Sequence, residues 1–357
     1  MLKFLREHKI EDKVIAVGVS GGADSLALAL WAVENAKSCG IKIVALTVDH
    51  GLRPESSDEA QYVAKILQNF GVEHHILVWK GKKPETGIEE AARIARYNLI
   101  KNWCFEHNIG SLMVAHHLLD QAETFFMRIH RGSGLDGLCG MSAVSSYEGL
   151  KILRPFLHKH PDEMKEYLRG KNIKWVEDSS NQNEDFLRVK IRKFLPILEQ
   201  KTGISAQKIV KTMDTLACSR SYIEAQTEKF MQNNCRFIVD CAIGVSQSNL
   251  ANLHREIIYR FLAEALKKIG NRTYQPRAED LLRLSEKILL DDFCGATLAD
   301  CEIFKHRNRI WIIPEAKNLP MPTKSQWEEF LQKNPQFARL DMSGKLKRIL
   351  YHNGGTR

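Results

Sequence analysis

The chain has 357 residues, 44 % hydrophobic and 27 % charged, which is typical of a folded globular protein of about two domains. This composition excludes a wholly disordered chain, a collagen-like fibre and a small disulfide-bonded scaffold. The longest apolar stretches are strand-sized, far short of the roughly 20 residues that a membrane-spanning helix needs. The charged N-terminus lacks the apolar run of a secretory signal, so we expect a cytoplasmic protein without membrane association.

The net charge of +9 is distributed unevenly along the chain. Residues 1–150 carry 16 Lys and Arg against 18 Asp and Glu, whereas residues 151–357 carry 36 against 25. A basic second part predicts a polyanionic partner, and nucleic acid fits because clustered cations release counterions from phosphates. A merely basic, solvated surface is the alternative.

The first part of the chain alternates strand and helix patterns. Apolar, β-branched runs predict strands over residues 13–19, 41–48, 72–79 and 110–115. Helical patterns follow them over residues 23–37, 56–69, 85–106 and 118–131. Strands this apolar, each followed by a helix, predict an α/β fold with a doubly wound parallel sheet. Ligands of such sheets bind beyond the carboxyl ends of the strands.

The second part has a different pattern. A glycine-rich loop over residues 131–138 and a basic segment over 150–200 close the first domain. Residues 201–315 predict a second, mainly helical C-terminal domain with short strands, and residues 316–357 a polar tail. We expect this tail to be poorly ordered or a reduced extra domain.

The eight cysteines are scattered along the chain, and no two have C-x-x-C spacing. A zinc knuckle or an iron–sulfur anchor therefore has no support in the sequence. We predict that the cysteines serve as small buried hydrophobic residues.

The motif Ser20-Gly21-Gly22-Ala23-Asp24-Ser25 lies between the first predicted strand and its helix. Free backbone N–H groups and the positive end of the helix dipole meet at such a turn, which makes it an anion site. Asp24 would repel a phosphate unless Mg²⁺ or an ammonium lay between them. The motif matches neither the Walker nor the Rossmann glycine pattern. A serine N-cap with a tight glycine turn is the structural alternative.

This hexapeptide resembles the signature of the ATP pyrophosphatase (PP-loop) family. Further motifs, in the same order, resemble the tRNA(Ile)-lysidine synthetases within it. These motifs are Val48–Arg53, Ala92–Tyr97, Ala115–Thr124, Arg131–Leu135, Arg154-Pro155 and Trp175–Asn181. Two departures stand out: Leu119 replaces the first of two frequent adjacent acids, and Val189 replaces the asparagine of an R-N-x-x-R element.

The resemblance implies an ATP-dependent, tRNA-modifying ligase. In the family's reaction, the C2 oxygen of the wobble cytidine of tRNA(Ile) with a CAU anticodon attacks the α-phosphorus of ATP, and pyrophosphate leaves. The ε-amine of free L-lysine then attacks C2 and expels AMP, giving lysidine and changing codon reading from AUG to AUA. ATP and Mg²⁺ are the implied cofactors. Residues 1–200 would be the catalytic PP-loop domain and 201–315 the tRNA-binding domain. The resemblance leaves undecided whether the protein forms a homodimer.

The resemblance also implies roles for individual residues. The catalytic set is Asp24, His116, Asp120 and Glu123. The nucleotide-binding set is Ser20, Gly21, Gly22, Ala23, Asp24, Ser25, Asp49, His50 and Arg96, with Arg96 at the α-phosphate. The RNA-binding set is Arg131, Arg188 and Arg192, and the candidate Mg²⁺ ligands are Asp24 and Asp120. His116 would meet the activated cytidine, and Asp120 and Glu123 the lysine ammonium or the metal.

Each role has a plainer alternative. Acidic residues in a first helical turn also interact favourably with the helix dipole. An aspartate after a strand also caps a turn, and arginines on a helix are often simply solvated. Three rival functions stay open as well: a tRNA thiolase of the same superfamily, an amide-forming synthetase acting on a small carboxylate, and a non-catalytic tRNA-binding protein.

Overall fold

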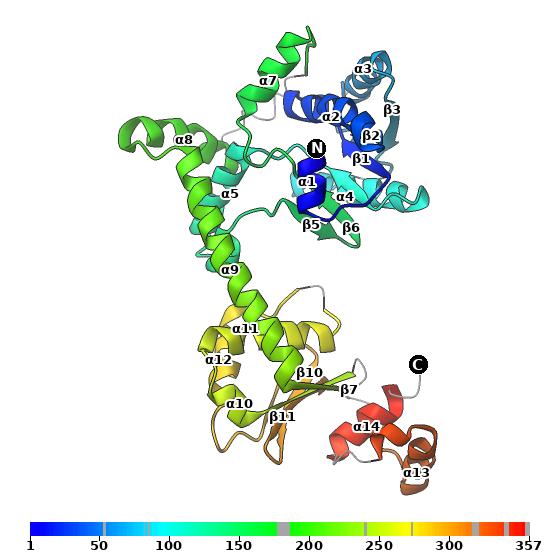
Figure 1. Cartoon of the computed structure of the whole chain (residues 1–357), viewed down its shortest axis with the longest axis vertical. Helices are drawn as coiled ribbons and strands as arrows, with labels where there is room; N and C mark the ends of the chain where they lie inside the picture. Colours follow the sequence, from blue (N-terminus) through cyan, green and yellow to red (C-terminus); the bar gives the residue numbers. More distant parts are fainter. Residues whose placement is uncertain are drawn as a thin grey trace. The chain divides into compact units, whose positions relative to one another are not determined.

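The structure is a computed structural model that divides into two compact units, Met1–Ala217 and Cys218–Arg357 (Figure 1). It describes residues 1–52, 55–81, 83–84, 86–176, 186–238, 241–272, 274–315, 321–338 and 343–353. Within these ranges, every helix is too short or too polar to cross a bilayer.

The first unit is built on a six-stranded sheet with the order β3-β2-β1-β4-β6-β5. The strands are β1 (Val14–Gly18), β2 (Lys42–Asp49), β3 (Glu73–Val78), β4 (Ser111–Met113), β5 (Val144–Tyr147) and β6 (Leu150–Leu153). All neighbouring strands run parallel except β5 and β6, which form an antiparallel hairpin. The predicted doubly wound parallel sheet is confirmed, and the hairpin is an addition that the sequence patterns do not indicate.

Helices cover both faces of this sheet. Packed on one face are α2 (Ala23–Ala36), α3 (Ser56–Asn69) and α7 (Pro161–Gly170), and on the other α4 (Ile88–Glu106). The side chains of β1 alternate between the two cores: Ile15 and Val17 belong to the first, and Ala16 belongs to the second. Both faces of β1 are therefore buried, which explains its continuous apolar sequence.

The strand order creates a crevice at one edge of the sheet. β1 pairs with β2 on one side and with β4 on the other, so the segments that follow β1 and β4 diverge between them. The motif Ser20–Ser25 follows β1, and the motif Ala115–Thr124 follows β4. Residues from both motifs thus meet at the carboxyl edge.

A third cluster joins the helices that follow the sheet. Leu118 and Ala122 of α5 (Leu118–His130) pack against Ile191 and Leu195 of α8 (Leu187–Thr202). The short elements η1 (Lys37–Cys39), α1 (Leu2–Glu7) and α6 (Leu135–Leu138) complete this unit. The long helix α9 (Ala206–Asn234) contributes Met213 to this cluster and Phe230 to the core of the second unit.

The second unit combines helices with a five-stranded antiparallel sheet of order β7-β8-β11-β10-β9. The strands are β7 (Cys235–Ile238), β8 (Ala242–Ser246), β9 (Gly295–Leu298), β10 (Cys301–His306) and β11 (Arg309–Pro314). Its helices are α10 (Gln247–Ala251), α11 (Arg255–Ile269) and α12 (Ala278–Lys287). The short strands that the sequence predicts over residues 296–304 and 309–313 correspond to β9–β11, whereas β7 and β8 have no counterpart among the expected elements.

The described residues near the C-terminus, 321–338 and 343–353, are folded. α13 (Lys324–Lys333), η4 (Pro335–Phe337) and α14 (Gly344–Asn353) pack through Phe330, Leu346 and Leu350 against Trp311 of β11. The expectation of a poorly ordered tail is therefore wrong for these described residues, because their few apolar side chains share one buried face.

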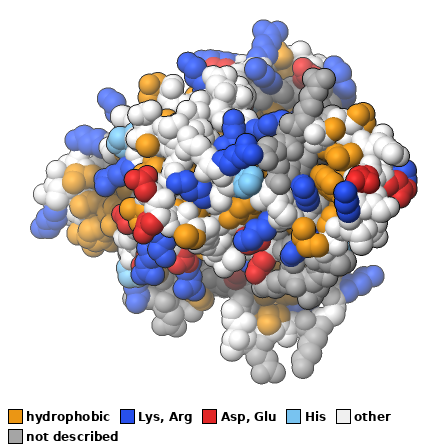
Figure 2. Space-filling model, turned by 90° about the horizontal axis from the view of Figure 1, so that it is seen from below, with side chains coloured by type: hydrophobic (Ala, Val, Ile, Leu, Met, Phe, Trp, Pro, Cys, Tyr) orange, Lys and Arg blue, Asp and Glu red, His pale blue; other side chains and the backbone are white. Residues whose placement is uncertain are grey.

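The surface carries many cations. Figure 2 shows Lys and Arg side chains at several places among hydrophobic and acidic ones.

The packing of β8 on β11 generates a stability prediction. A Cβ atom at Gly244 would lie 2.6–2.8 Å from ring carbons of the buried Trp311. We expect Gly244→Ala to lower the free energy of unfolding by about 1–3 kcal/mol, since an overpacked core must shift. Urea denaturation measures this. Gly170→Ala is the control, because nothing lies within 4 Å of its added Cβ; equal losses in the two variants would contradict the prediction.

Candidate active site

Two serines of the turn after β1 form hydrogen bonds within it. Ser25 Oγ accepts a hydrogen bond from Ser20 N at 3.0 Å and donates one to Gly22 O at 3.0 Å. The first intrahelical bond of α2 joins Leu26 N to Gly22 O. The N–H groups of the first helical turn are therefore not used by the helix, and they point out of its N-terminus. This geometry binds anions.

Gly21 is required by the backbone of this turn. Its φ of +87° is one that side-chain-bearing residues rarely adopt. An added Cβ would lie 3.2 Å from Val63 Cγ2 of α3, and Val176 N donates to Gly21 O at 3.0 Å. Neighbouring segments thus pack closely against the glycine and hold the turn in place.

Asp24 in the first turn of α2 carries an unsatisfied carboxylate. Its Oδ1 atom is buried without a hydrogen-bond partner, and Oδ2 lies 3.6 Å from His117 Nε2. Burial raises the pKa of this carboxyl, which the nearby His117 opposes. A cation beside Oδ1 would compensate the buried charge.

The donor set at Asp24 fits Mg²⁺ bound partly by a substrate. The described residues contain no group of three or more His, Cys, Asp or Glu that could hold a metal ion. Mg²⁺ is commonly held by one or two carboxylates together with substrate phosphates. Asp24, next to an anion-binding turn, fits that pattern better than Asp120, whose two oxygens already accept hydrogen bonds.

His117 connects the two segments of the site. It is the N-cap of α5: its Nδ1 accepts from Asp120 N at 3.4 Å, and Asp120 Oδ2 accepts from His117 N at 3.0 Å. Its other ring nitrogen faces Asp24. The sequence-based assignment omits His117, although a residue before a helix with an acid three positions later is a capping-box signal.

His116 lies beside this bridge in a different environment. Burial, before any charge effect, lowers the pKa of His116 to about 4, and its Nδ1 is buried without a partner. The imidazole is therefore neutral near pH 7 and can meet a ligand as a hydrogen-bonding group without carrying charge.

The acids of α5 are paired with the arginines of α8. Glu123 is fully buried and accepts from Arg188 Nε at 2.6 Å and from Arg192 Nε at 2.7 Å. Asp120 Oδ1 accepts from Arg188 Nη2 at 2.8 Å. Burial alone would raise the pKa of Asp120, but the charges of His117 and Arg188 outweigh it and lower the pKa. Residues expected to bind lysine and RNA separately thus form one network.

Three of the expected nucleotide-binding residues, Asp49, His50 and Arg96, lie near the end of β2. Asp49 Oδ1 accepts from Gly51 N at 2.9 Å and from Ser56 Oγ at 2.7 Å, so this carboxylate caps its turn. His50 Nε2 accepts from Arg96 Nε at 3.3 Å. Burial, with a smaller effect of Arg96, lowers the pKa of His50 to about 4. The structure therefore brings Arg96 to the same sheet edge.

Other expected residues lie apart or outside the described residues. Arg131 is exposed at the C-terminal end of α5, about 20 Å along the helix axis from His117. Arg53 and residues 177–185, which include the end of the Trp175–Asn181 motif, lie outside the described residues.

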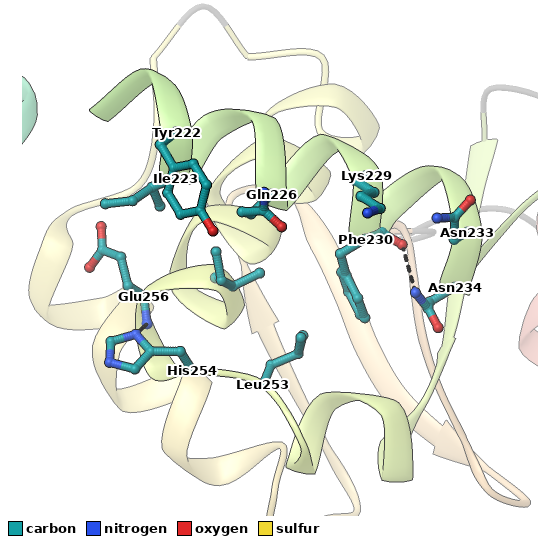
Figure 3. A pocket seen from close by; sticks show the side chains of 11 residues that line it. Tyr222, Ile223, Gln226, Lys229, Phe230, Asn233, Asn234, Leu253, His254 and Glu256 are labelled. Atoms are coloured by element: carbon teal, nitrogen blue, oxygen red, sulfur yellow. Dashed lines mark hydrogen bonds between the residues drawn. The ribbon is translucent and has the colours of Figure 1, made fainter. Parts of the chain in front are cut away.

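A groove in the second unit offers less chemistry. It has a volume of about 530 Å³ and lies between α9 and the start of α11 (Figure 3). Its histidine, His254, caps α11 by accepting from Glu256 N at 3.2 Å. Phe230 and Leu253 give the groove an apolar lining, so we assign the chemistry to the sheet edge of the first unit.

Comparison with known proteins identifies the family. The family model described as "PP-loop domain" matches residues 1–198. The tRNA(Ile)-lysidine synthase of Wolbachia pipientis wMel is 34 % identical over 328 residues, covering 88 % of this chain and 75 % of that one. The corresponding protein of Hyphomonas neptunium is 35 % identical over 325 residues, covering 89 % and 86 %. The chain belongs to the tRNA(Ile)-lysidine synthase family.

A solved structure supports the fold of this synthase family member. The U34-tRNA thiolase NcsA from Methanococcus maripaludis superposes with a TM-score of 0.52 at 19 % sequence identity. The match covers 60 % of this chain and 76 % of the thiolase. At this identity the similarity shows a shared PP-loop fold.

The two departures from the synthase pattern have structural explanations. Leu119 packs in the apolar cluster between α5 and α8. Val189 is buried on α8, between the arginines that pair with Glu123. Leu119 therefore adds apolar contact at the junction that the ion pairs hold together, and Val189 is buried close to this junction in sequence.

The buried carboxylate of Glu123 generates a prediction for this synthase fold. A neutral amide cannot balance two guanidinium groups, so we expect Glu123→Gln to lower the free energy of unfolding by about 1–3 kcal/mol. The loss is below that of a fully buried pair because Arg188 and Arg192 are each 40 % exposed. Urea denaturation measures it.

Glu163→Gln is the matched control, since Glu163 is 51 % exposed and pairs with Lys159 on the surface. Its stability should stay at the level of the unaltered protein. Unchanged stability of Glu123→Gln would show that the buried pairs do not secure α8.

Proposed function

We propose that the protein performs the tRNA(Ile)-lysidine synthase reaction as an ATP-dependent ligase. It adenylates C2 of the wobble cytidine of tRNA(Ile) with a CAU anticodon and joins free L-lysine there, releasing pyrophosphate and AMP. The modified base then reads AUA instead of AUG.

One observation carries this proposal. A single sheet edge holds an anion-binding turn and, beside it, a continuous chain of charged groups that runs from Asp24 through His117 and Asp120 to the α8 arginines. The turn suits a triphosphate, and the chain supplies both cation-binding and anion-binding groups at the place where the acceptor must arrive.

In the first step, the site positions the polyphosphate for attack. The turn Ser20–Ser25 holds the phosphates through backbone N–H and hydroxyl groups, and Arg96 lies where it reaches the α-phosphate. When bound, Mg²⁺ at Asp24 neutralises the charge of the leaving pyrophosphate. The neutral His116 meets the cytidine by a hydrogen bond, since it adds no charge to the attacking base.

In the second step, the lysine ε-amine must lose a proton before or during its attack on C2. His117 Nε2 faces Asp24, and its other nitrogen is fixed by Asp120. Because Nδ1 accepts from Asp120 N, the neutral imidazole carries its proton on Nε2, so we assign His117 the positioning of the two carboxylates, and the proton of the amine passes to water. The expelled AMP leaves through the side of the cleft that bound ATP.

We assign catalysis to residues 1–200 and tRNA binding to residues 201–315, with Arg131 as a further RNA contact. The excess of cations beyond residue 150 supports RNA binding by this part of the chain; residues 201–315 carry 17 Lys and Arg against 14 Asp and Glu, and residues 316–357 carry 8 against 3. A homodimer and a cytoplasmic location stay predictions of the family resemblance.

A thiolase reaction is the nearest rival, and the cysteines oppose it. Burial raises the pKa of the Cys104 thiol to about 12, and Cys139 is also buried. Cys218 and Cys294 are exposed, so the expectation of buried cysteines is wrong for these two. All four are free cysteines without a C-x-x-C partner. A sulfur-transfer enzyme needs reactive thiolates or a cluster that they ligate.

Incubation of the protein with radiolabelled lysine, ATP, Mg²⁺ and purified tRNAs tests the proposal. We expect label in tRNA(Ile) with a CAU anticodon and equal amounts of AMP and pyrophosphate. AMP release without lysine transfer would favour another adenylating enzyme. Absence of both products would favour a protein that only binds tRNA.

Asp24 generates a prediction in which activity and stability separate. Asp24→Asn removes the charge that would hold the cation, so tRNA-dependent AMP formation should fall by about 100-fold or more. The same change removes a partly buried, uncompensated carboxylate. Thermal unfolding should therefore show a melting temperature equal to or above that of the unaltered protein; normal turnover would refute the cation-binding role.

His117 generates a second prediction on catalysis. Asn is among the most favoured N-cap residues, so the His117→Asn variant should fold normally. Lysine transfer to adenylated tRNA should fall by about 100-fold or more, because the two carboxylates lose their fixed relation. His160→Asn is the control, because His160 caps α7 with the same capping box outside the site. Equal effects of the two substitutions on lysine transfer would reduce His117 to a structural cap.

A further inference from the structure

Arg154, directly after β6, is a partly buried cation that hydrogen-bonds only neutral groups. Burial lowers its pKa, and the like charge of Arg93 lies close enough to lower that pKa as well. Its Nη1 donates to Ser142 O and to Ser145 Oγ, both at 2.9 Å, and its Nε is buried without a partner. No Asp or Glu among the described residues pairs with it. A guanidinium removed from water without a counter-charge costs free energy, which an anionic ligand would recover.

The strand order places Arg154 on the acceptor side of the site. Val114 N donates to Leu153 O at 2.9 Å, so the chain leaving β4 runs beside the residue that precedes Arg154. Ile152 and Leu112 both belong to the core under α4, and strand alternation carries Arg154 and His116 onto that same face. β4 therefore separates Arg154 from the phosphate-binding turn after β1.

The other arginines of this edge already have partners. Arg188 and Arg192 bind Asp120 and Glu123, and Arg96 donates to His50. The proposed reaction brings three anionic groups to the site: the triphosphate of ATP, the RNA backbone and the carboxylate of free lysine. The triphosphate lies at the turn after β1, which leaves the last two for Arg154.

We propose that Arg154 binds the α-carboxylate of the incoming lysine and thereby selects an amino acid over a simple amine. The assignment rests on the proposed function. Nη1 uses both of its hydrogens on Ser142 and Ser145, which fixes the orientation of the guanidinium and leaves Nη2 to bind a carboxylate by a charge-assisted hydrogen bond.

The depth of Arg154 favours the amino acid over the RNA backbone. A buried Nε lies beyond the reach of a phosphodiester that stays in a folded RNA, whereas free lysine enters the cleft whole. Held by its carboxylate beyond β4, the lysine extends its side chain past His116 toward the reacting carbon. The carboxylate contact then sets which amines reach the adenylated base.

The decisive experiment compares two nucleophiles with Arg154→Gln. Cadaverine has the chain and the amine of lysine but no carboxylate. We expect the substitution to reduce kcat/KM for lysine by about 10- to 100-fold, through KM, because a charged hydrogen-bonded contact is lost. For cadaverine kcat/KM should change less than twofold, as should tRNA affinity and the formation of adenylated tRNA without lysine.

Arg6→Gln is the matched control. Arg6 is an exposed arginine in the last turn of α1, and its loss should leave the preference for lysine intact. Arg154→Lys keeps the charge but not the guanidinium, so it should restore part of the affinity for lysine.

Three outcomes would overturn the assignment. The unaltered protein could use cadaverine or lysinamide as well as lysine, which tests the carboxylate without any substitution. Arg154→Gln could weaken both nucleophiles equally, or it could weaken tRNA binding, which would assign the guanidinium to an RNA phosphate. Absence of any lysine transfer by the unaltered protein is a different result, because it would refute the proposed function itself.

Discussion

The buried carboxylate of Glu123 is the interaction on which the arrangement of the active site depends. It lies on α5 with no exposed surface and binds arginines that arrive from α8, 65 and 69 residues further along the chain. A buried charge of this kind is tolerated only when partners neutralise it. The need to neutralise Glu123 therefore fixes α8 against α5, and through Arg188 it also fixes Asp120. Leu119 adds apolar contacts at the same junction.

From Asp120 the charge network extends to the phosphate-binding turn through His117. The imidazole has two roles at once, since one nitrogen caps a helix and the other faces a carboxylate. A helix cap holds its side chain in a defined orientation, so the imidazole keeps Asp120 and Asp24 in a fixed relation. Gln121, in the same motif, accepts from Met141 N and donates to Met141 O, both at 2.8 Å. The motif thus combines residues for chemistry with residues that hold neighbouring loops.

Much of the first unit could be predicted from sequence, because its buried strands are continuous apolar runs and its turn motif follows β1. The hairpin of β5 and β6 could not, since Ser145 and Ser146 interrupt the apolar pattern of β5. The pairing of Glu123 with arginines of α8 could not be predicted from the sequence either, because spacing along the chain does not show which distant helices make contact. The role of His117 required the approach of Asp24, which only the packing of β1 beside β4 provides.

Four buried polar atoms without hydrogen-bond partners lie at the carboxyl edge of the sheet: Asp24 Oδ1, His50 Nδ1, His116 Nδ1 and Arg154 Nε. Folded proteins normally satisfy such atoms, so their concentration at one edge indicates groups reserved for ligands. The charges of these groups differ along the strand order. The carboxylate beyond β1 favours a bound cation, and the guanidinium beyond β6 favours a bound anion. Under the proposed function, this order would place the nucleotide at β2 and β1, the reacting centre at β4 and the amino acid at β6.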